Sequence, residues 1–90
     1  MSLSKDTTAD LSRRLETVEG HLRAVRRMAG QGQECAQLLL QLSAVRSAID
    51  RAANLVLREH LDQCLRRAIE SGDRSAALSE LESILKYVVS

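Results

Sequence analysis

The 90-residue sequence contains no proline, no tryptophan and no phenylalanine, and its one aromatic side chain is Tyr87. A short chain that is 44% hydrophobic and has no proline is typical of a single all-α domain, which we expect to span residues 1–90. With a single aromatic ring, the chain lacks the stacking surface that binds the bases of single-stranded nucleic acid.

Long apolar runs are missing as well. No stretch of 18 apolar residues occurs, and the N-terminus lacks the basic-then-apolar pattern of a signal segment. We therefore expect a cytoplasmic protein without a membrane partner. In that compartment, the two cysteines are expected to be reduced thiols rather than a structural disulfide.

Catalytic motifs are also absent from the sequence. There is no glycine-rich phosphate loop, no Cys-x-x-Cys redox pair, and no serine beside a suitable base and orienting acid. An enzyme is the function class that the sequence supports least.

One long amphipathic stretch, residues 33–70, dominates what is present. Its apolar residues recur at intervals of three and four, which predicts a helix roughly 55 Å long that ends at Gly72. A 90-residue chain cannot cover such a helix from its own material, so the helix requires a partner. The apolar positions are Leu38, Leu39, Leu42, Val45, Ile49, Ala52, Ala53, Val56, Leu57, Leu61, Leu65 and Ile69.

Two shorter helices are predicted on either side of it. The first runs from about Thr8 to Ala29, with Thr7 and Asp10 resembling a capping box and residues 1–7 forming a flexible tail. Gly30 and Gly32 end this helix, and Gly20 inside it suggests either a close approach of another backbone or a tolerated surface glycine. The third helix follows Asp73, and its apolar stripe comprises Leu78, Leu81, Leu85 and Val88.

Three potential metal donors lie on the long helix. His60 and Cys64 are four residues apart and share a face, whereas Cys35 lies 25 residues before His60, or about 37 Å along the axis. Two copies packed antiparallel about a two-fold axis near Ala48 and Ile49 would bring Cys35 of one copy to the pair of the other, which gives two identical sites. Two thiolates and one imidazole suit Cu(I) better than structural zinc, which normally has four ligands.

Each donor also has a simpler interpretation. A free cysteine is often a small buried hydrophobic residue, and His60 could be a hydrogen-bonded histidine at an interface. His21 on the first helix has no spacing that places it at the site, so we interpret it as a surface or interfacial residue.

Positive charge is concentrated in the first predicted helix, although the net charge of the chain is only +1. Between Leu11 and Gly30, the sequence contains five arginines and only two acidic residues, Glu16 and Glu19. They can form either an ordinary solvated face or a phosphate-binding surface that oligomerisation multiplies. These arginines are Arg13, Arg14, Arg23, Arg26 and Arg27.

Ordered motifs over residues 11–88 resemble the copper-sensing operon repressor (CsoR) group of bacterial transcription regulators. The group also includes sensors of nickel or cobalt, formaldehyde, and sulfane sulfur. The matching segments are Arg14-Leu15, Val18-Glu19-Gly20-His21-Leu22-Arg23, Cys35, Gln41-Leu42-Ser43-Ala44-Val45-Arg46-Ser47-Ala48-Ile49-Asp50-Arg51 and His60-Leu61-x-x-Cys64.

The resemblance implies a three-helix protomer, a dimer on antiparallel second helices, a dimer-of-dimers tetramer, and operator binding without a helix-turn-helix. Cys35, His60 and Cys64 match the copper ligands of the group, and Glu80 matches a glutamate that hydrogen-bonds around them. Glu34 occupies the position at which copper sensors usually have a tyrosine, which also belongs to the hydrogen-bonding residues around the ligands. Arg14 and Arg51 match residues implicated in DNA binding, whereas Thr17 replaces a common arginine.

Few residues separate the subtypes of this group. Nickel and cobalt sensors add an N-terminal histidine near the position of Leu3, and formaldehyde sensors use an N-terminal proline where this chain has Ser2. Sulfane-sulfur sensors keep both cysteines but usually lack the histidine, so His60 favours copper. The sequence thus predicts a cytoplasmic homotetramer that binds operator DNA in the apo state and leaves it on binding Cu(I). The alternatives are a persulfide-responsive repressor that uses the same cysteines, and a structural helical dimerisation module.

Overall fold

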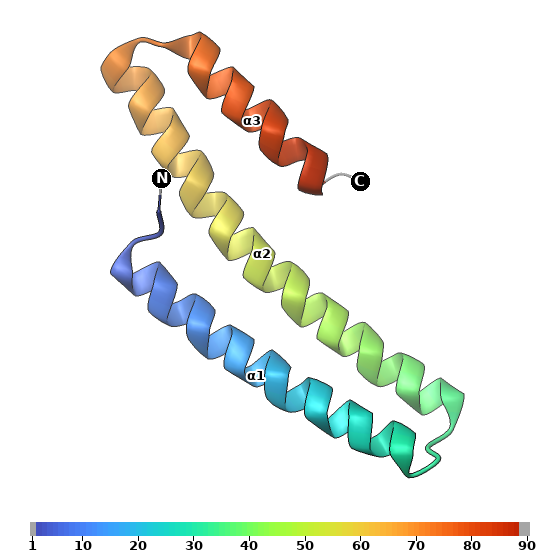
Figure 1. Ribbon diagram of the computed structural model, residues 1–90. Coiled ribbons are helices and arrows are strands. Elements are labelled where there is room, and N and C mark those ends of the chain that lie inside the picture. The colour runs from blue at the N-terminus through green and yellow to red at the C-terminus, as the bar shows by residue number, and fades with distance from the viewer. Residues whose placement is uncertain (1, 89–90) are drawn as a thin grey trace.

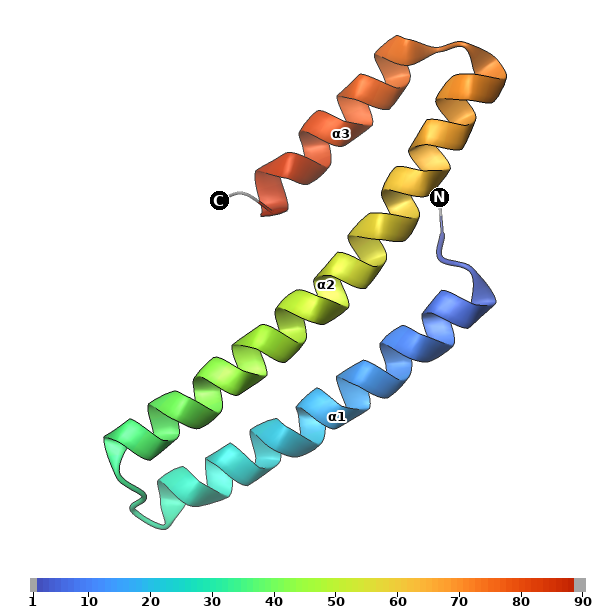
Figure 2. The same ribbon diagram turned by 180° about the vertical axis from the view of Figure 1, so that it is seen from behind.

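A computed structural model describes residues 2–88, which form three helices and no strand. Helix α1 spans Lys5–Gly30, α2 spans Cys35–Ser71 and α3 spans Arg74–Val88. α1 and α2 lie side by side as an antiparallel hairpin, and α3 folds back along the C-terminal part of α2 (Figures 1 and 2). The protomer is elongated, measuring 58 × 28 × 13 Å. The predicted all-α, three-helix fold is therefore confirmed.

α1 begins three residues earlier than the sequence predicted. Its N-cap is Ser4, whose hydroxyl accepts a hydrogen bond from the backbone N–H of Thr7 at 3.2 Å. The capping box assigned to Thr7 and Asp10 is therefore wrong, because serine is a better N-cap than threonine and Ser4 has the extended backbone that a cap needs. The tail predicted over residues 1–7 is too long, since residues 5–7 form the first turn of α1; Met1 lies outside the described residues.

Both ends of α2 have identifiable signals. Glu34 is the N-cap, so α2 starts two residues later than Gln33. Gly72 ends it in the left-handed conformation, at φ 70°, and its N–H donates to the carbonyl of Ala68 at 2.9 Å. Asp73 then accepts a hydrogen bond from the N–H of Ala76 at 3.1 Å. The predicted C-cap of α2 and the predicted cap of α3 are confirmed.

The interior of the protomer is small. Val18 and Val25 of α1 pack against Val45 of α2, with Leu38 and Ala48 at the border of this cluster. Ala52 and Cys64 are the other buried apolar residues among those described. Large apolar side chains remain exposed along α2 and α3, as expected for a helix that needs a partner. They include Leu39, Leu40, Leu42, Ile49, Leu65, Ile69, Leu78 and Leu85.

Gly20 is not in close contact with another part of the protomer. A Cβ atom built on this residue would meet no atom within 4 Å. Within a single chain, Gly20 is therefore a tolerated surface glycine and not a point of close approach to another backbone.

Within residues 2–88, no helix is both long enough and apolar enough to cross a lipid bilayer.

The start of the chain is attached to α2 by a group of hydrogen bonds that we call the N-terminal tether. The carboxylate of Glu59 accepts the backbone N–H of Ser4 and the hydroxyl of Thr7, both at 3.0 Å. Gln63, one turn further along α2, donates to the carbonyl of Ser2 at 3.1 Å. Hydrogen bonding from Ser4, followed by a smaller contribution from Thr7, lowers the pKa of Glu59 against the opposing effect of partial burial. The tether therefore favours the ionised carboxylate.

We expect the tether to weaken in acid. Because the pKa of Glu59 is lower in the folded state, its stabilisation is complete above the unfolded value of about 4.3 and is lost as the pH falls through the folded value. Glu59→Gln should therefore lower the free energy of unfolding near pH 7, and its difference from the wild type should shrink as the pH falls below about 4.3 and through the lowered pKa of Glu59. Hydrogen exchange at residues 4–8 should accelerate in the variant at neutral pH.

The matched control is Glu16→Gln, which neutralises an exposed glutamate of α1 away from the tether. An equal loss of stability in both variants, with the same pH dependence, would show that net charge and not the tether is responsible.

Candidate metal centre and arginine surface

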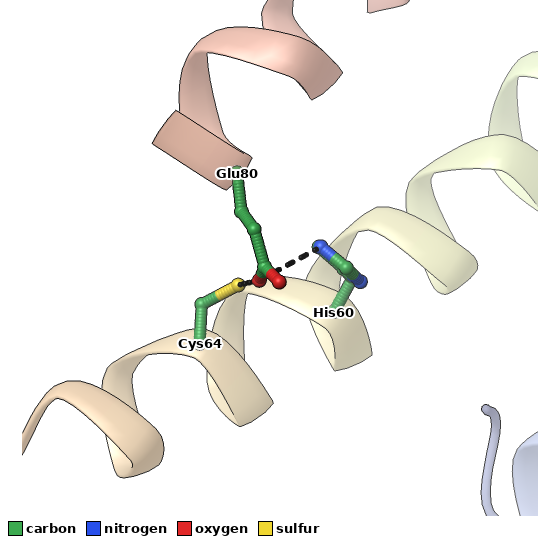
Figure 3. Close-up of side chains that lie close together, drawn as sticks. All are labelled: His60, Cys64 and Glu80. Atoms are coloured by element: carbon green, nitrogen blue, oxygen red, sulfur yellow. Dashed lines mark hydrogen bonds and ion pairs between the residues drawn. The ribbon is translucent and has the colours of Figure 1, made fainter. Parts of the chain in front are cut away.

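His60, Cys64 and Glu80 form the one group of potential metal ligands found among the described residues (Figure 3). His60 and Cys64 lie one turn apart on α2 and point to the same side. Glu80 reaches them from α3, because Gly72 and Asp73 fold α3 back along α2. The thiol of Cys64 donates to Oε2 of Glu80 at 3.0 Å, and Nε2 of His60 lies 3.9 Å from the same oxygen. One donor atom from each residue lies within 4.8 Å of the others.

The carboxylate of Glu80 keeps Cys64 protonated. The hydrogen bond to Glu80 is the main cause that raises the pKa of Cys64, and burial and the negative charge of Glu80 add to it. The hydrogen bond from Cys64 is in turn the main cause that lowers the pKa of Glu80, with help from Arg67, whose Nη1 lies 3.5 Å from Oε1, and from His60. Cys64 is only 2% exposed, so a metal ion that binds its sulfur must displace this proton.

Cys35 does not lie with this group. It is the first residue of α2 and is exposed, as is Glu34 beside it. The 25 residues between Cys35 and His60 correspond to about seven helical turns, or about 37 Å. One chain therefore supplies His60 and Cys64 but not the third predicted donor, and both cysteines are free thiols.

The donor types present fit a soft metal ion. Thiolate and imidazole are ligands that Cu(I) accepts, and a second thiolate would complete a three-coordinate site. A carboxylate such as Glu80 is a harder ligand, and its hydrogen bond to Cys64 suits it to orienting a donor rather than to binding Cu(I) itself.

The arginines predicted to bind DNA gather in two places. Arg14 of α1 and Arg51 of α2 line the same depression, and Arg13 and Thr17 border a second one beside it. Arg23, Arg26 and Arg27 line a separate depression near the C-terminal end of α1. Asp10 pairs with Arg13 at 2.7 Å and with Arg14 at 3.2 Å, which offsets part of their charge.

Sequence reasoning missed two residues beside this arginine pair. Asn54 and Arg58 line the depression together with Arg14 and Arg51. The signal was present, because Arg58 follows Arg51 by seven residues and therefore falls on the same face of α2. Arg58 was not identified because the charge argument considered only the arginine-rich first helix, whereas Arg58 lies on α2.

His21 lies away from the metal-binding group. Its Nε2 atom is 2.8 Å from the side-chain oxygen of Gln41, which connects α1 to α2. The ring is half-buried, so His21 is a hydrogen-bonded residue between helices.

A three-helix fold with potential metal ligands near the end of α2 is compatible with a metal-responsive regulator, and a family comparison identifies the class. The model of the metal-sensitive transcriptional repressor family matches residues 7–87, so the chain belongs to that family. This is a family of transcriptional repressors and not a class of enzyme.

The proteins to which the chain is similar include a nickel-responsive regulator as well as copper-sensing repressors. The chain is 36% identical to the copper-sensing transcriptional repressor CsoR of Mycobacterium tuberculosis (strain ATCC 25618 / H37Rv) over 88 residues, which cover 94% of this chain and 74% of that one. Among solved structures, it is similar to the nickel-responsive transcriptional regulator InrS, with a TM-score of 0.89, 35% identity, and coverage of 98% of this chain and 99% of that one. It is also similar to the copper-sensing repressor CsoR with Cu(I) from Geobacillus thermodenitrificans NG80-2, with a TM-score of 0.86, 27% identity, and coverage of 100% and 94%. The resemblance drawn from the sequence motifs is confirmed.

Proposed function

We propose that this protein is a Cu(I)-responsive repressor that binds operator DNA without metal and leaves it when Cu(I) binds. The observation that carries the proposal is the placement of three soft donors on one side of α2. His60 and Cys64 lie together near its end, and Cys35 lies about seven whole turns away on the same side. As a regulator of transcription, the protein would act in the cytoplasm.

The same side of α2 supports an antiparallel dimer. Leu42 and Ile49 follow Cys35 at intervals of seven residues, so they continue its face, and they are 47% and 46% exposed. A second copy packed on this face with opposite direction would cover these side chains and bring Cys35 to His60 and Cys64 at both ends. Further exposed apolar residues on α3, such as Leu78 and Leu85, support assembly of dimers into a tetramer.

Coupling between metal and DNA follows from the contact of Cys64 with Glu80. To hold a metal ion, Cys64 would have to give up its proton, and it would then no longer donate a hydrogen bond to Glu80. The Glu80 carboxylate must then find other partners, of which Arg67 is the nearest charged one. The resulting shift of α3 against α2 would change how the arginines meet the DNA. Coupling is reciprocal, so DNA must weaken metal binding by the same factor.

The runner-up is a thiol switch in which sulfur bridges Cys35 and Cys64 of neighbouring protomers. Sensor cysteines of that kind are exposed and have a low pKa. Cys64 is only 2% exposed, which limits the access of polysulfide to its sulfur, and His60 beside it is a nitrogen donor that a sulfur bridge does not use. A nickel sensor is disfavoured because Leu3 stands where such sensors have a histidine.

One experiment separates these functions. Reduced, anaerobic protein is titrated onto DNA from its own upstream region, and Cu(I), Ni(II) or polysulfide is added separately. Cu(I) alone should lower the DNA affinity by about 5- to 150-fold, the usual range of allosteric coupling. Thiolate-to-copper charge-transfer absorbance should rise in parallel in the ultraviolet. Release of the DNA by polysulfide but not by Cu(I) would support the thiol switch, and release by Ni(II) alone would support a nickel sensor. If the protein neither binds the DNA nor shows charge-transfer absorbance with Cu(I), the structural dimerisation module is the remaining interpretation.

A further inference from the structure

The depression that contains Arg14 and Arg51 holds a third arginine, Arg58, and an amide, Asn54. Arg51, Asn54 and Arg58 are exposed and lie three and four residues apart, so they form one stripe along α2. Arg51 and Arg58 are about 10 Å apart along the helix axis. Leu55 completes the lining, so the depression contains three guanidinium groups and no carboxylate.

Arg51 and Arg58 are also free of ion pairs within the part of the chain that the structure describes. No carboxylate oxygen of residues 2–88 lies within 4.0 Å of either guanidinium group, although Arg14 pairs with Asp10. Asp62, four residues after Arg58, pairs with Arg66 at 3.1 Å instead. These two arginines therefore keep their positive charge available for an external anion.

The stripe lies on the opposite side of α2 from the metal donors. Successive residues of a helix turn by about 100°, so Arg58, two positions before His60, points about 160° away from it. Arg51 has the same relation to Ile49, whose exposed side chain belongs to the face proposed for the dimer. A partner helix on the metal-binding face would leave the arginine stripe uncovered.

We infer that Arg58 and Asn54 belong, with Arg14 and Arg51, to one binding site for the phosphates of duplex DNA. The inference rests on the proposed repressor function and extends it, because the site is then built mainly on α2 and not only on the arginine-rich α1. Each guanidinium group presents a planar set of donors that matches a phosphate. Asn54 lies between the two arginines and supplies an uncharged hydrogen-bond donor to the same DNA backbone.

The test measures operator affinity as a function of salt concentration for Arg58→Ala, Arg51→Ala and Asn54→Ala. Removing an arginine that binds one phosphate should reduce the slope of log affinity against log salt by about 0.9. Arg58→Ala and Arg51→Ala should therefore both weaken binding and flatten the slope. Asn54→Ala should weaken binding with an unchanged slope, since a neutral amide releases no counterion. Arg58→Lys should recover the slope.

Arg74→Ala is the matched control, because it removes one arginine from α3, away from the depression. It should retain the wild-type slope. Helical content by circular dichroism and Cu(I) affinity without DNA should stay at wild-type values in all variants, which shows that they fold.

The inference would be overturned if Arg58→Ala kept the wild-type operator affinity and salt slope while Arg51→Ala lost affinity. The proposed repressor function would not be affected by that result. Wild-type affinity of Asn54→Ala would remove Asn54 from the site. Wild-type protein that does not bind the operator at all would overturn both the inference and the proposed function.

Discussion

Replacing His60 with alanine is expected to abolish the release of operator DNA by Cu(I). His60 is the only nitrogen donor in the proposed site, and two thiolates remain to bind the metal without it. The two thiolates alone would bind Cu(I) with two-coordinate geometry. They would not reproduce the three-coordinate arrangement that the complete ligand set would impose on the protein. The DNA affinity of the variant without metal should be unchanged. Cu(I), which is expected to weaken DNA binding of the wild type by about 5- to 150-fold, should no longer change the affinity of the variant.

His21→Ala is the matched control, because it removes the other histidine, which is hydrogen-bonded to Gln41 away from the metal-binding group. It should keep the response to Cu(I). His60→Ala protein that still leaves the operator at the wild-type Cu(I) concentration would refute the assignment of this ligand. Wild-type protein that ignores Cu(I) but crosslinks Cys35 to Cys64 between protomers in polysulfide would replace the copper sensor with the thiol switch.

Mixing two inactive variants should restore copper binding if each site spans two protomers. Cys35→Ala lacks one donor and the double variant His60→Ala, Cys64→Ala lacks the other two, so neither forms a complete site alone. A heterodimer of the two has one complete site, made of Cys35 from one chain and His60 with Cys64 from the other. Random re-pairing of equal amounts should yield about a quarter of the wild-type number of high-affinity sites.

Competition with a Cu(I) chelator after co-refolding provides the measurement. Mixing the double variant with Cys35→Ala, Cys64→Ala protein is the control, because no heterodimer of that pair has a complete site. If co-refolding of the first pair recovers no high-affinity binding, the antiparallel arrangement of α2 is wrong.

The helices could be predicted from the sequence because their signals are local. The spacing of apolar residues identified all three, and Gly72 and Asp73 located the boundary between α2 and α3. The start of α1 was misplaced because Ser4 and Thr7 are both good caps three residues apart. What distinguishes them is Glu59, 55 residues away from Ser4, which binds the backbone at Ser4. Local patterns contain no information about that contact.

The candidate site was only partly accessible for the same reason. The spacing of His60 and Cys64 placed them on one face of α2, but the position of Glu80 depends on how α3 folds back and was available only through the family resemblance. The raised pKa of Cys64 follows from that contact and could not be derived from the sequence. The cluster of Arg14 with Arg51, Asn54 and Arg58 depends on the pairing of α1 with α2.

The N-terminal tether makes α1 a rod that is attached to α2 at both ends. One attachment is the turn after Gly30, where Gly32 adopts a positive φ of 76°. The other is Glu59, the neighbour of His60, which binds Ser4 and Thr7. If metal binding rotates this end of α2, α1 is pulled at its start and pivots about the glycine turn. Displacement grows with distance from a pivot, and Arg14 lies about 24 Å from Gly30, whereas Arg27 lies about 4.5 Å from it. Arg14 would then move about five times as far as Arg27, so the rotation would disturb the DNA contacts of Arg14 most and those of Arg27 least.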